Sequence, residues 1–247
     1  MTPPEIFPDE TVEDLQAGGL RLIQKRNGFR FGTDAVLLAD FASGTAAREI
    51  LDLCTGTGIV PILLSHKTNT PRIFGLEIQK VICGMAQRSV ALNGLERRVE
   101  IRQGDLRQAA AYYGRGRFDM VTCNPPYMKA GAGIQNAAEE KLIARHEVTC
   151  TLSDVVQASA ELLRPGGHLI MVHRPSRLAE LFWAMRQRQL EPKRLRLVHP
   201  APDREPVLCL VDGSLRGGTE LRILPPLFLR DPAGGESKEL KKIYGRG

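Results

Sequence analysis

The sequence LDLCTGTGIV at residues 51–60 joins an apolar, strand-like run to a helical segment through a loop that holds Gly56 and Gly58. Glycines at such a turn let a ligand approach the backbone, beside the free amide groups that open a helix. Taken alone, the pattern also fits an ordinary strand-to-helix turn. Two acidic residues favour a ligand site, because Glu77 and Asp105 end the next two strand-like runs. The first can accept hydrogen bonds from both hydroxyls of a ribose, and the second can reach an adenine amino group.

Pro61 separates two classes of ligand. A dinucleotide site requires G-x-G-x-x-G or A, because the third small residue lets the helix pack beside a pyrophosphate. In this chain the third position is Pro61. We therefore rank a nicotinamide-dependent hydride-transfer enzyme below a protein that binds a nucleoside without a phosphate.

Strand-like and helical runs alternate from residue 49 onward, which predicts right-handed βαβ units and a parallel sheet. Residues 200–205 are short enough to join the last two strands as an antiparallel pair. The expected fold is α/β and Rossmann-like, with a mostly parallel seven-stranded sheet whose last strand is antiparallel. The expected strands are 49–54, 72–78, 99–105, 118–123, 168–174, 194–199 and 206–212, and the main helices are 59–67, 80–94, 153–163 and 176–189.

Two elements are expected before this core. Residues 20–31 alternate in polarity around Asn27–Gly28, a strong hairpin signal, and residues 33–43 predict a helix that Thr33 could cap. We therefore divide the chain into an N-terminal hairpin and helix packed on the core (1–48), a main domain (49–229) and a polar tail expected to fray (230–247).

The composition restricts the class of protein. The chain has 247 residues, 43% hydrophobic and 25% charged, and no apolar run approaches the roughly 20 residues that cross a bilayer. Its polar, proline-rich start resembles neither a signal nor a transit peptide. We expect a cytoplasmic protein without membrane contact and, by default, a monomer with no obligate protein partner. The net charge of +6 is compatible with an anionic partner such as nucleic acid.

The five cysteines are odd in number and widely spaced, with no C-x-x-C pair and no histidine at ligand spacing. We therefore expect neither a bound metal nor disulfides. Cys54, Cys123 and Cys209 fall within apolar strand-like runs, where a reduced thiol behaves as a small hydrophobic group. Reduced thiols indicate a reducing compartment.

The sequence CNPPY at residues 123–127 follows the fourth expected strand, at the sheet edge where open α/β folds bind ligands. The two prolines restrict the backbone and make it a rigid bracket. Such a bracket suits methylation of a planar nitrogen, because the Asn124 side-chain oxygen and the Pro125 carbonyl can accept both amine hydrogens and localise the lone pair. Catalysis would then depend on orientation and fixed dipoles. Tyr127 would stack on the flat acceptor; the alternative for the Pro-Pro pair alone is a tight turn.

With Asp52 added, the glycine loop gives the pattern D-x-C-x-G-x-G. This pattern resembles the cofactor site of class I S-adenosylmethionine-dependent methyltransferases. The N-P-P-Y motif is shared by adenine-N6 methyltransferases of DNA and RNA, guanine-N2 methyltransferases of ribosomal RNA and glutamine-N5 methyltransferases of release factors. GFRFGTDAVLLADF (28–41), ARHE (144–147) and RPGGHLIMVHRPSRL (164–178) narrow the choice. With these segments the chain resembles, from about residue 10 to 229, the family of valine-tRNA adenine-N6 methyltransferases, which act on an adenine beside the anticodon.

The resemblance implies roles for individual residues, with S-adenosylmethionine as cofactor and tRNA as partner. In the cofactor site, Phe31, Gly32 and Thr33 would close over the methionine end, Asp52, Cys54, Gly56 and Gly58 would line the amino acid, Glu77 the ribose, and Asp105 and Leu106 the adenine. Asn124, Pro125, Pro126 and Tyr127 would hold the target base, with Asn124 also facing the cofactor. Core packing is the alternative for Phe31, and helix capping alone is the alternative for Thr33.

Basic residues are the candidates for contact with RNA. In the expected long loop 128–150 they are Lys129, Lys141 and Arg145, and elsewhere they are Lys25, Arg26, Arg30, Arg194 and Arg196. Each alone also fits a solvated surface charge, but together they could form a rim around the pocket. Arg145–His146–Glu147 has no task in the mechanism and is expected to have a structural or RNA-positioning role.

The rival functions are a glutamine-N5 protein methyltransferase, a guanine-N2 ribosomal RNA methyltransferase and a non-catalytic RNA-binding protein with a vestigial fold.

Overall fold

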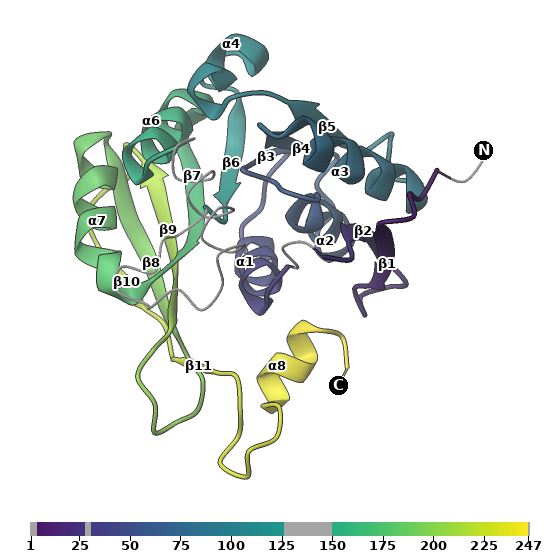
Figure 1. Cartoon of the computed structure of the whole chain (residues 1–247). Helices are drawn as coiled ribbons and strands as arrows, with labels where there is room; N and C mark the ends of the chain where they lie inside the picture. The colour runs from purple at the N-terminus through teal and green to yellow at the C-terminus, as the bar shows by residue number, and fades with distance from the viewer. Residues whose placement is uncertain (1–3, 28–30, 126–149, 247) are drawn as a thin grey trace.

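A computed structural model describes residues 4–27, 31–125 and 150–246. A nine-stranded sheet lies between two layers of helices, with strand order β10-β8-β9-β7-β6-β3-β4-β5 and with β11 also paired to β8 (Figure 1). The strands are β3 (Glu49–Leu53), β4 (Arg72–Glu77), β5 (Val99–Gln103), β6 (Phe118–Cys123), β7 (Leu163–His173), β8 (Leu190–His199), β9 (Leu208–Leu215), β10 (Arg222–Ile223) and β11 (Leu227–Phe228). No helix among the described residues is both long and apolar enough to span a membrane.

The predicted sheet is confirmed. All seven expected strands form, and β9 runs antiparallel to both β7 and β8 while the other main strands are parallel. The two-residue strands β10 and β11, which the sequence pattern is too short to reveal, extend the sheet beyond β8. Residues 164–167, which precede the expected strand 168–174, also belong to β7.

Two helical layers cover the sheet (Figure 1). On one face lie α1 (Thr33–Ser43), α2 (Ile59–Lys67) and α3 (Lys80–Leu92), and on the other lie α4 (Ala109–Tyr113), α6 (Leu152–Leu162) and α7 (Leu178–Gln187). Side chains alternate along each strand. In β3, Ile50 joins the α1–α2–α3 core while Leu51 and Leu53 join the α4–α6–α7 core. Asp52 therefore faces the first layer, toward α1 and α2.

The N-terminal hairpin forms at a different place from the one expected. β2 (Arg21–Lys25) pairs antiparallel with the upstream β1 (Glu10–Asp14), so Asn27–Gly28 is not the turn of this hairpin. The turn uses Gly18 and Gly19, whose φ angles of 58° and 75° favour glycine. The pair Gly18–Gly19 was the sequence signal that the Asn27–Gly28 pair obscured.

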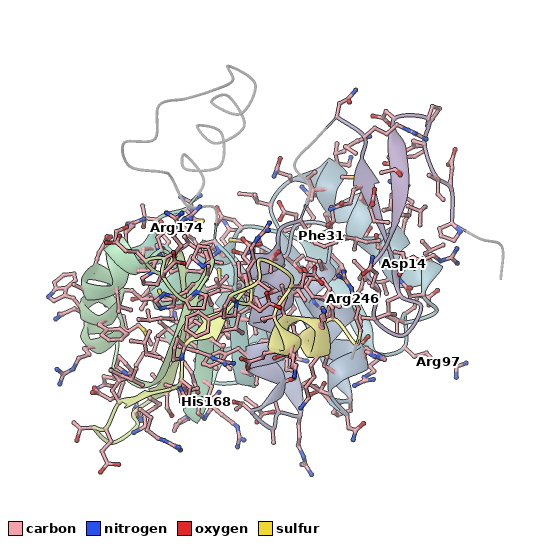
Figure 2. All side chains as sticks on the ribbon, turned by 90° about the horizontal axis from the view of Figure 1, so that it is seen from below. Asp14, Phe31, Arg97, His168, Arg174 and Arg246 are labelled. Carbon is pink, nitrogen blue, oxygen red and sulfur yellow. The ribbon has the colours of Figure 1, made fainter. Side chains whose placement is uncertain are left out.

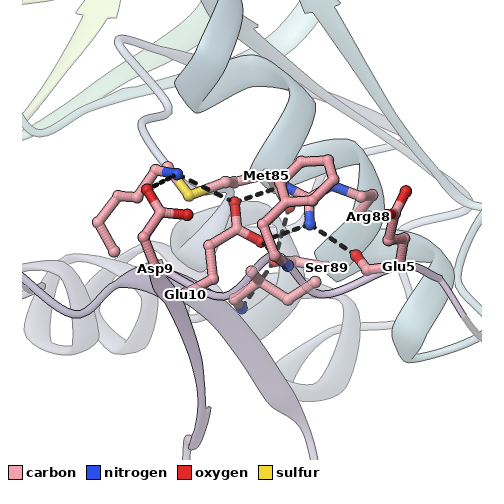
Figure 3. A network of polar contacts seen from close by, with 9 residues as sticks. Glu5, Asp9, Glu10, Met85, Arg88 and Ser89 are labelled. Atoms are coloured by element: carbon pink, nitrogen blue, oxygen red, sulfur yellow. Dashed lines mark hydrogen bonds and ion pairs between the residues drawn. The ribbon is translucent and has the colours of Figure 1, made fainter.

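A buried ion-pair network attaches the hairpin to α3 (Figure 3). The carboxylate of Glu10 accepts hydrogen bonds from both terminal nitrogens of Arg88, at 2.6 and 2.7 Å. The Lys25 ammonium group lies 3.5 Å from Glu10 and 2.6 Å from Asp9. Hydrogen bonding from Arg88 lowers the pKa of Glu10 to about 2, against the effect of burial. A bidentate pair of this kind fixes orientation as well as adding attraction.

The C-terminal segment differs from the frayed tail expected after Leu229. It ends in α8 (Lys238–Ile243), whose Leu240 and Ile243 are buried in the α1–α2–α3 core. The Lys67 ammonium group of α2 donates to the Ile243 carbonyl at 2.8 Å and to Asp40 of α1 at 2.9 Å. The apolar pair at 240 and 243 has helical spacing and faces the core, whereas the overall polarity of the segment suggested no such contact.

Candidate functional site at the carboxyl edge of the sheet

The parallel register brings the ends of four strands to one edge. Leu53 is paired with Leu76 on one side and with Cys123 on the other, and Cys123 is paired with Met171. In Figure 2, Arg174, which follows β7, lies on the opposite side of the view from His168, in the middle of that strand. The described residues that directly follow β3, β4, β5, β6 and β7 therefore lie at one edge of the sheet, the edge where open α/β folds bind ligands.

The glycine loop after β3 is fixed by β4. The Thr55 amide donates to the Leu76 carbonyl at 3.0 Å, and Gly56 and Gly58 follow with φ angles of 56° and 84°. Gly58 is the N-cap of α2, and a Cβ there would lie 3.2 Å from Ala86 of α3. Around Gly56, by contrast, no described heavy atom lies within 4 Å of the position a Cβ would take. The loop therefore presents an open backbone surface at a helix start, as the sequence suggested.

Glu77 ends β4 with its side chain between this loop and α3. One carboxylate oxygen accepts from the Gly56 amide at 3.0 Å, and the other accepts from the Gln79 amide at 2.9 Å. The residue is only 5% exposed. Two backbone donors thus fix the orientation of the carboxylate and leave further lone pairs for the hydroxyls of a ligand.

Asp52 is almost completely buried beneath the loop, at 1% exposure. Its carboxylate accepts a 2.6 Å hydrogen bond from the hydroxyl of Thr122, its register partner on β6. Burial raises the pKa of Asp52 to about 7, although the bond from Thr122 acts in the opposite direction. Sequence reasoning missed Thr122. Its position two residues before Asn124, and therefore on the same face of β6, could have indicated that its hydroxyl lies near the site.

Asp105 lies two residues after β5 and caps the short helix η1 (Leu106–Gln108) through the Arg107 amide. The Arg107 guanidinium also binds both carboxylate oxygens of Asp105, at 2.5 and 3.0 Å. This bonding lowers the pKa of Asp105, so the group is ionised near neutral pH. Leu106 is buried at the start of η1. Sequence reasoning did not assign a partner to Asp105, although an arginine two residues later is suited to this pairing.

Three cysteines gather around the first loop. Cys54 has a φ of 57°, a left-handed conformation that is uncommon for a residue with a side chain. Its sulfur lies 3.9 Å from the sulfur of Cys150, and Cys123 lies buried on the adjacent strand. Burial raises the pKa of Cys123, although the hydrogen bond with Cys54 acts in the opposite direction. The hydrogen bond with Cys54 and burial together raise the pKa of Cys150, so both thiols are protonated near neutral pH.

Phe31, Gly32 and Thr33 lie at the start of α1, which runs antiparallel to β3 and so begins at the carboxyl edge. All three are half-buried, and Phe31 packs against the core of that layer. Thr33 does not cap the helix: the N-cap is Gly32, and no side-chain capping bond is present there. The extended conformation of Gly32 places Thr33 one residue inside the helix, where its hydroxyl is past the capping position.

Asn124 and Pro125 follow β6 directly, with Asn124 half-buried and Pro125 buried. They continue the strand whose Cys123 pairs with Leu53, which places them beside the first residues of the glycine loop. Several predicted site residues lie outside the described residues, namely Arg30, Pro126, Tyr127, Lys129, Lys141, Arg145, His146 and Glu147.

A buried histidine at the end of β7 was not predicted as part of the site. His173 is 2% exposed, and its Nδ1 accepts the Arg174 amide at 2.8 Å. Burial lowers the pKa of His173 to about 4, so the ring is neutral near pH 7. The residue supplies a neutral, hydrogen-bonded wall at the carboxyl edge.

Four of the residues named for the basic rim are described, and each of them is bound to a group within the fold. Arg194 is paired with the buried Asp212 at 2.7 Å, beside the middle of β7, and Arg196 is paired with Glu239 of α8 at 2.6 Å. Lys25 belongs to the hairpin network described above, and Arg26 donates to the Pro8 carbonyl at 3.3 Å. These contacts draw the side chains into the fold because carboxylates and carbonyls lie closer to them than the crevice.

The residues at the edge fit a cationic nucleoside. Gly56 provides open backbone, Glu77 and Asp105 are fixed carboxylates, and Asp52 can become a third one beneath the loop. Carboxylates are the natural partners of ribose hydroxyls, adenine amines and ammonium groups.

The chain matches a known family model and known proteins in sequence. The model described as methyltransferase small domain matches residues 26–187. A tRNA1(Val) (adenine(37)-N6)-methyltransferase of Porphyromonas gingivalis is 31% identical over 183 residues, covering 72% of this chain and 71% of the relative. A relative of the same name from Shewanella sp. is 27% identical over 216 residues, covering 86% and 89%.

Solved structures share the fold at lower identity. A predicted O-methyltransferase from Agrobacterium tumefaciens has a TM-score of 0.70 and 20% identity, covering 87% of this chain and 97% of that structure. The 16S rRNA N2 G1207 methyltransferase of T. thermophilus, solved with AdoMet and guanosine, has a TM-score of 0.60 and 17% identity, covering 86% and 52%. These likenesses confirm the Rossmann-like fold.

Proposed function

Since this chain belongs to the methyltransferase small domain family and to the group of tRNA1(Val) adenine-N6 methyltransferases within it, we propose that it methylates the exocyclic N6 amine of an adenine in tRNA. S-adenosylmethionine supplies the methyl group as a sulfonium when bound. The new N–C bond forms as the S–C bond breaks, and the surplus amine proton leaves to solvent.

The proposed binding of the cofactor follows the geometry of the edge. Gly56 and Gly58 lie along its amino acid, with Phe31, Gly32 and Thr33 closing the methionine end. Glu77 accepts from the ribose hydroxyls, and Asp105 with Leu106 holds the adenine. Asp52 balances the positive charge of the amino acid once it is ionised.

Asn124 and Pro125 hold the target amine. The Asn124 side-chain oxygen and the Pro125 carbonyl each accept one amine hydrogen, which moves the nitrogen toward tetrahedral geometry and directs its lone pair to the methyl group. No general base is required, so orientation and fixed dipoles carry the catalysis. An adenine in folded RNA must be flipped out of its stack to enter, and Tyr127 is proposed to stack on it.

The observation that carries this proposal is the register of β3 with β6. It places Asn124 beside the glycine loop, above the buried Asp52–Thr122 pair. In support of the proposal, Asn124 and Pro125 follow β6 at the same edge of the sheet as Glu77, which ends β4, and Asp105, which follows β5. The proposed substrate, an adenine next to the anticodon of valine tRNA, comes from the names of the relatives.

Nucleoside mass spectrometry tests the proposed function directly. Bulk tRNA and a valine tRNA transcript are incubated with the protein and S-adenosylmethionine, digested and analysed, and N6-methyladenosine is expected. Purified release factor serves as the rival substrate; methylated glutamine without methylated adenine would overturn the proposal. N2-methylguanosine in ribosomal RNA would indicate the other rival enzyme.

Ligand-induced stabilisation tests the cofactor separately. Saturating S-adenosylhomocysteine should raise the melting temperature, because a ligand that binds only the folded state stabilises it. NAD should leave it unchanged. If NAD raised the melting temperature and S-adenosylhomocysteine did not, a nicotinamide-dependent hydride-transfer enzyme would be favoured instead.

A further inference from the structure

Exposed apolar side chains gather on the outer flank of the sheet, away from the carboxyl edge. Among the described residues, seven large hydrophobic side chains are exposed, and three of them, Trp183, Leu221 and Ile223, belong to this flank. Trp183 is 66% exposed, in the middle of α7. Figure 1 shows α7 on the outside of the sheet with β10 beside it. An exposed indole forgoes the free energy that burial of its apolar surface would contribute to folding.

The exposed indole borders a groove. A hollow of about 620 Å³ lies between α7 and the chain before β10, lined by Phe182, Trp183, Arg186, Gln187, Glu191, Pro192 and Leu221. Ile223 faces the same side, because it is paired in register with Leu195, which packs into the α7 layer. We call this surface the α7 groove.

The α7 groove is bordered by positive charge. Residues 186–193 and 216–221 carry four basic side chains, Arg186, Arg188, Lys193 and Arg216, against the two acidic side chains Glu191 and Glu220. Glu191 is paired with Arg186 at 3.2 Å. The Arg216 amide donates to the Gln189 carbonyl at 2.7 Å, which places Arg216 at the end of α7. Lys193 holds the loop by donating to the Gly218 and Thr219 carbonyls.

We propose that the α7 groove binds unpaired nucleotides of an RNA, with Trp183 stacking against a base and the arginines neutralising the adjacent phosphates. An exposed aromatic ring flanked by basic side chains is the arrangement used by proteins that hold single strands. Unpaired RNA is the form that splays its bases onto aromatic side chains, whereas paired bases are hidden within the helix.

This surface is separate from the methylation site and gives the domain a second hold on its RNA. The reacting base enters at the carboxyl edge, whereas the α7 groove lies on the flank formed by α7, β8 and β10. Two holds on one RNA raise the overall affinity by keeping the second site at high local concentration.

The single tryptophan of the chain makes this proposal measurable. Emission of the full-length protein is recorded while an oligoadenylate of about 8 nucleotides or a tRNA transcript is added, with N-acetyltryptophanamide correcting for absorption by the RNA. We expect saturable quenching that salt reverses. An RNA duplex should leave the emission unchanged. Unchanged emission while labelled tRNA binds, or equal quenching by the duplex, would overturn the proposal.

Substitutions provide the matched controls. Trp183→Ala should weaken binding of labelled oligoadenylate by roughly 5- to 100-fold, the loss expected for one base–aromatic stack, and Trp183→Phe should retain most of the affinity. Ile6→Ala removes an exposed apolar side chain of the distant hairpin region and should change nothing. Arg186→Ala, which removes an arginine that lines the groove, should lower the salt dependence by about one phosphate contact. A change of emission with protein concentration alone would indicate a second copy in the groove and contradict the RNA assignment.

The outcome separates from that of the methylation assay. If N6-methyladenosine forms but RNA does not change the tryptophan emission, and Trp183→Ala binds RNA like the parent, the RNA-binding role of the α7 groove is wrong and the proposed methyltransferase activity stands. If RNA quenches the tryptophan emission but no methylated adenine forms, the α7 groove binds RNA and the proposed methyltransferase activity is wrong. Unchanged S-adenosylhomocysteine binding by Trp183→Ala confirms that this variant is folded.

Discussion

At the scale of single residues, the site contains a buried carboxylate, Asp52, whose ionised form destabilises the folded protein. Asp52 is 1% exposed, and burial raises its pKa to about 7, so at neutral pH the protein holds an ionisable group near its midpoint. Such shifts are typical of functional positions. A cation in the crevice would favour the ionised form, and ligand binding would then release a proton.

Asp52→Asn tests how much the ionisation of Asp52 destabilises the folded protein. Because the folded-state pKa of Asp52 lies above its unfolded value of 3.8, its contribution to stability is full below about pH 4 and is lost as pH rises through about 7. Relative to the parent, the variant should therefore gain in melting temperature between pH 4 and pH 8. Its affinity for S-adenosylmethionine should fall by at least tenfold in calorimetry. A pH-independent difference in melting temperature would contradict the proposed ionisation.

Asn124→Ala tests the clamp on the target amine. Removing the side-chain oxygen should lower turnover by about 100-fold or more, comparable to the loss of one preorganised hydrogen-bonding group in other enzymes. Calorimetric affinity for S-adenosylhomocysteine should change little. Equal turnover of parent and variant in the labelled-methyl assay would remove Asn124 from the mechanism.

At the scale of elements, the hairpin is attached to α3 by charge rather than by apolar area alone. The Glu10–Arg88 pair joins residues 78 positions apart in the chain, and the Phe7 ring lies 4.4 Å from the Arg88 guanidinium (Figure 3). The Ile23 amide also donates to the Ser89 hydroxyl at 3.0 Å. These contacts orient the hairpin, because a two-stranded ribbon has little stability of its own.

Arg88→Ala should destabilise the protein by about 3 kcal/mol, because it leaves the buried Glu10 carboxylate unpaired. The pKa of Glu10 in the folded parent, about 2, lies below its ordinary 4.5, so this stabilisation is present above about pH 4.5 and is lost as pH falls through about 2. The variant should therefore differ most from the parent near neutral pH in denaturant titrations. Arg97→Ala, an exposed arginine labelled in Figure 2, serves as control and should stay within about 0.5 kcal/mol. A similar small effect of both changes would contradict a structural role for the pair.

At the scale of the whole molecule, the C-terminus completes the helical layer that carries the glycine loop. α8 buries Leu240 and Ile243 against the core shared by α1 and α2, and Lys67 links the three helices through Asp40 and the Ile243 carbonyl. The start of α1 and the start of α2 both border the candidate site. The last residues of the chain therefore support the same layer as the cofactor loop.

Ile243→Ala should lower the free energy of unfolding by about 2 kcal/mol, the lower end for removing a buried aliphatic side chain, because its site lies near the surface. Lys241→Ala changes an exposed position of the same helix and should have an effect within about 0.5 kcal/mol. The denaturation midpoint measures both. If the two variants matched the parent, the tail would be frayed in solution, as its polarity alone suggests.

The sequence by itself determined the sheet and the loops that form its crevice. The places of Gly56, Gly58, Glu77, Asp105 and Asn124 could be predicted from the sequence because each lies at the end of a strand or shortly after it, where covalent spacing and apolar periodicity fix its position. Their roles stay predictions. The pairing of the last two strands followed in the same way from a short connection.

Only the tertiary structure decided which distant groups meet these positions. The bond between Thr122 and Asp52 spans 70 residues, the link from Lys67 to Ile243 spans 176, and the strand that pairs with β2 was upstream rather than downstream. Local patterns carry no information about such partners, because a side chain's hydrogen bonds and its pKa depend on which elements pack beside it. For the same reason Arg194 and Arg196, predicted to face RNA, are bound to carboxylates within the fold.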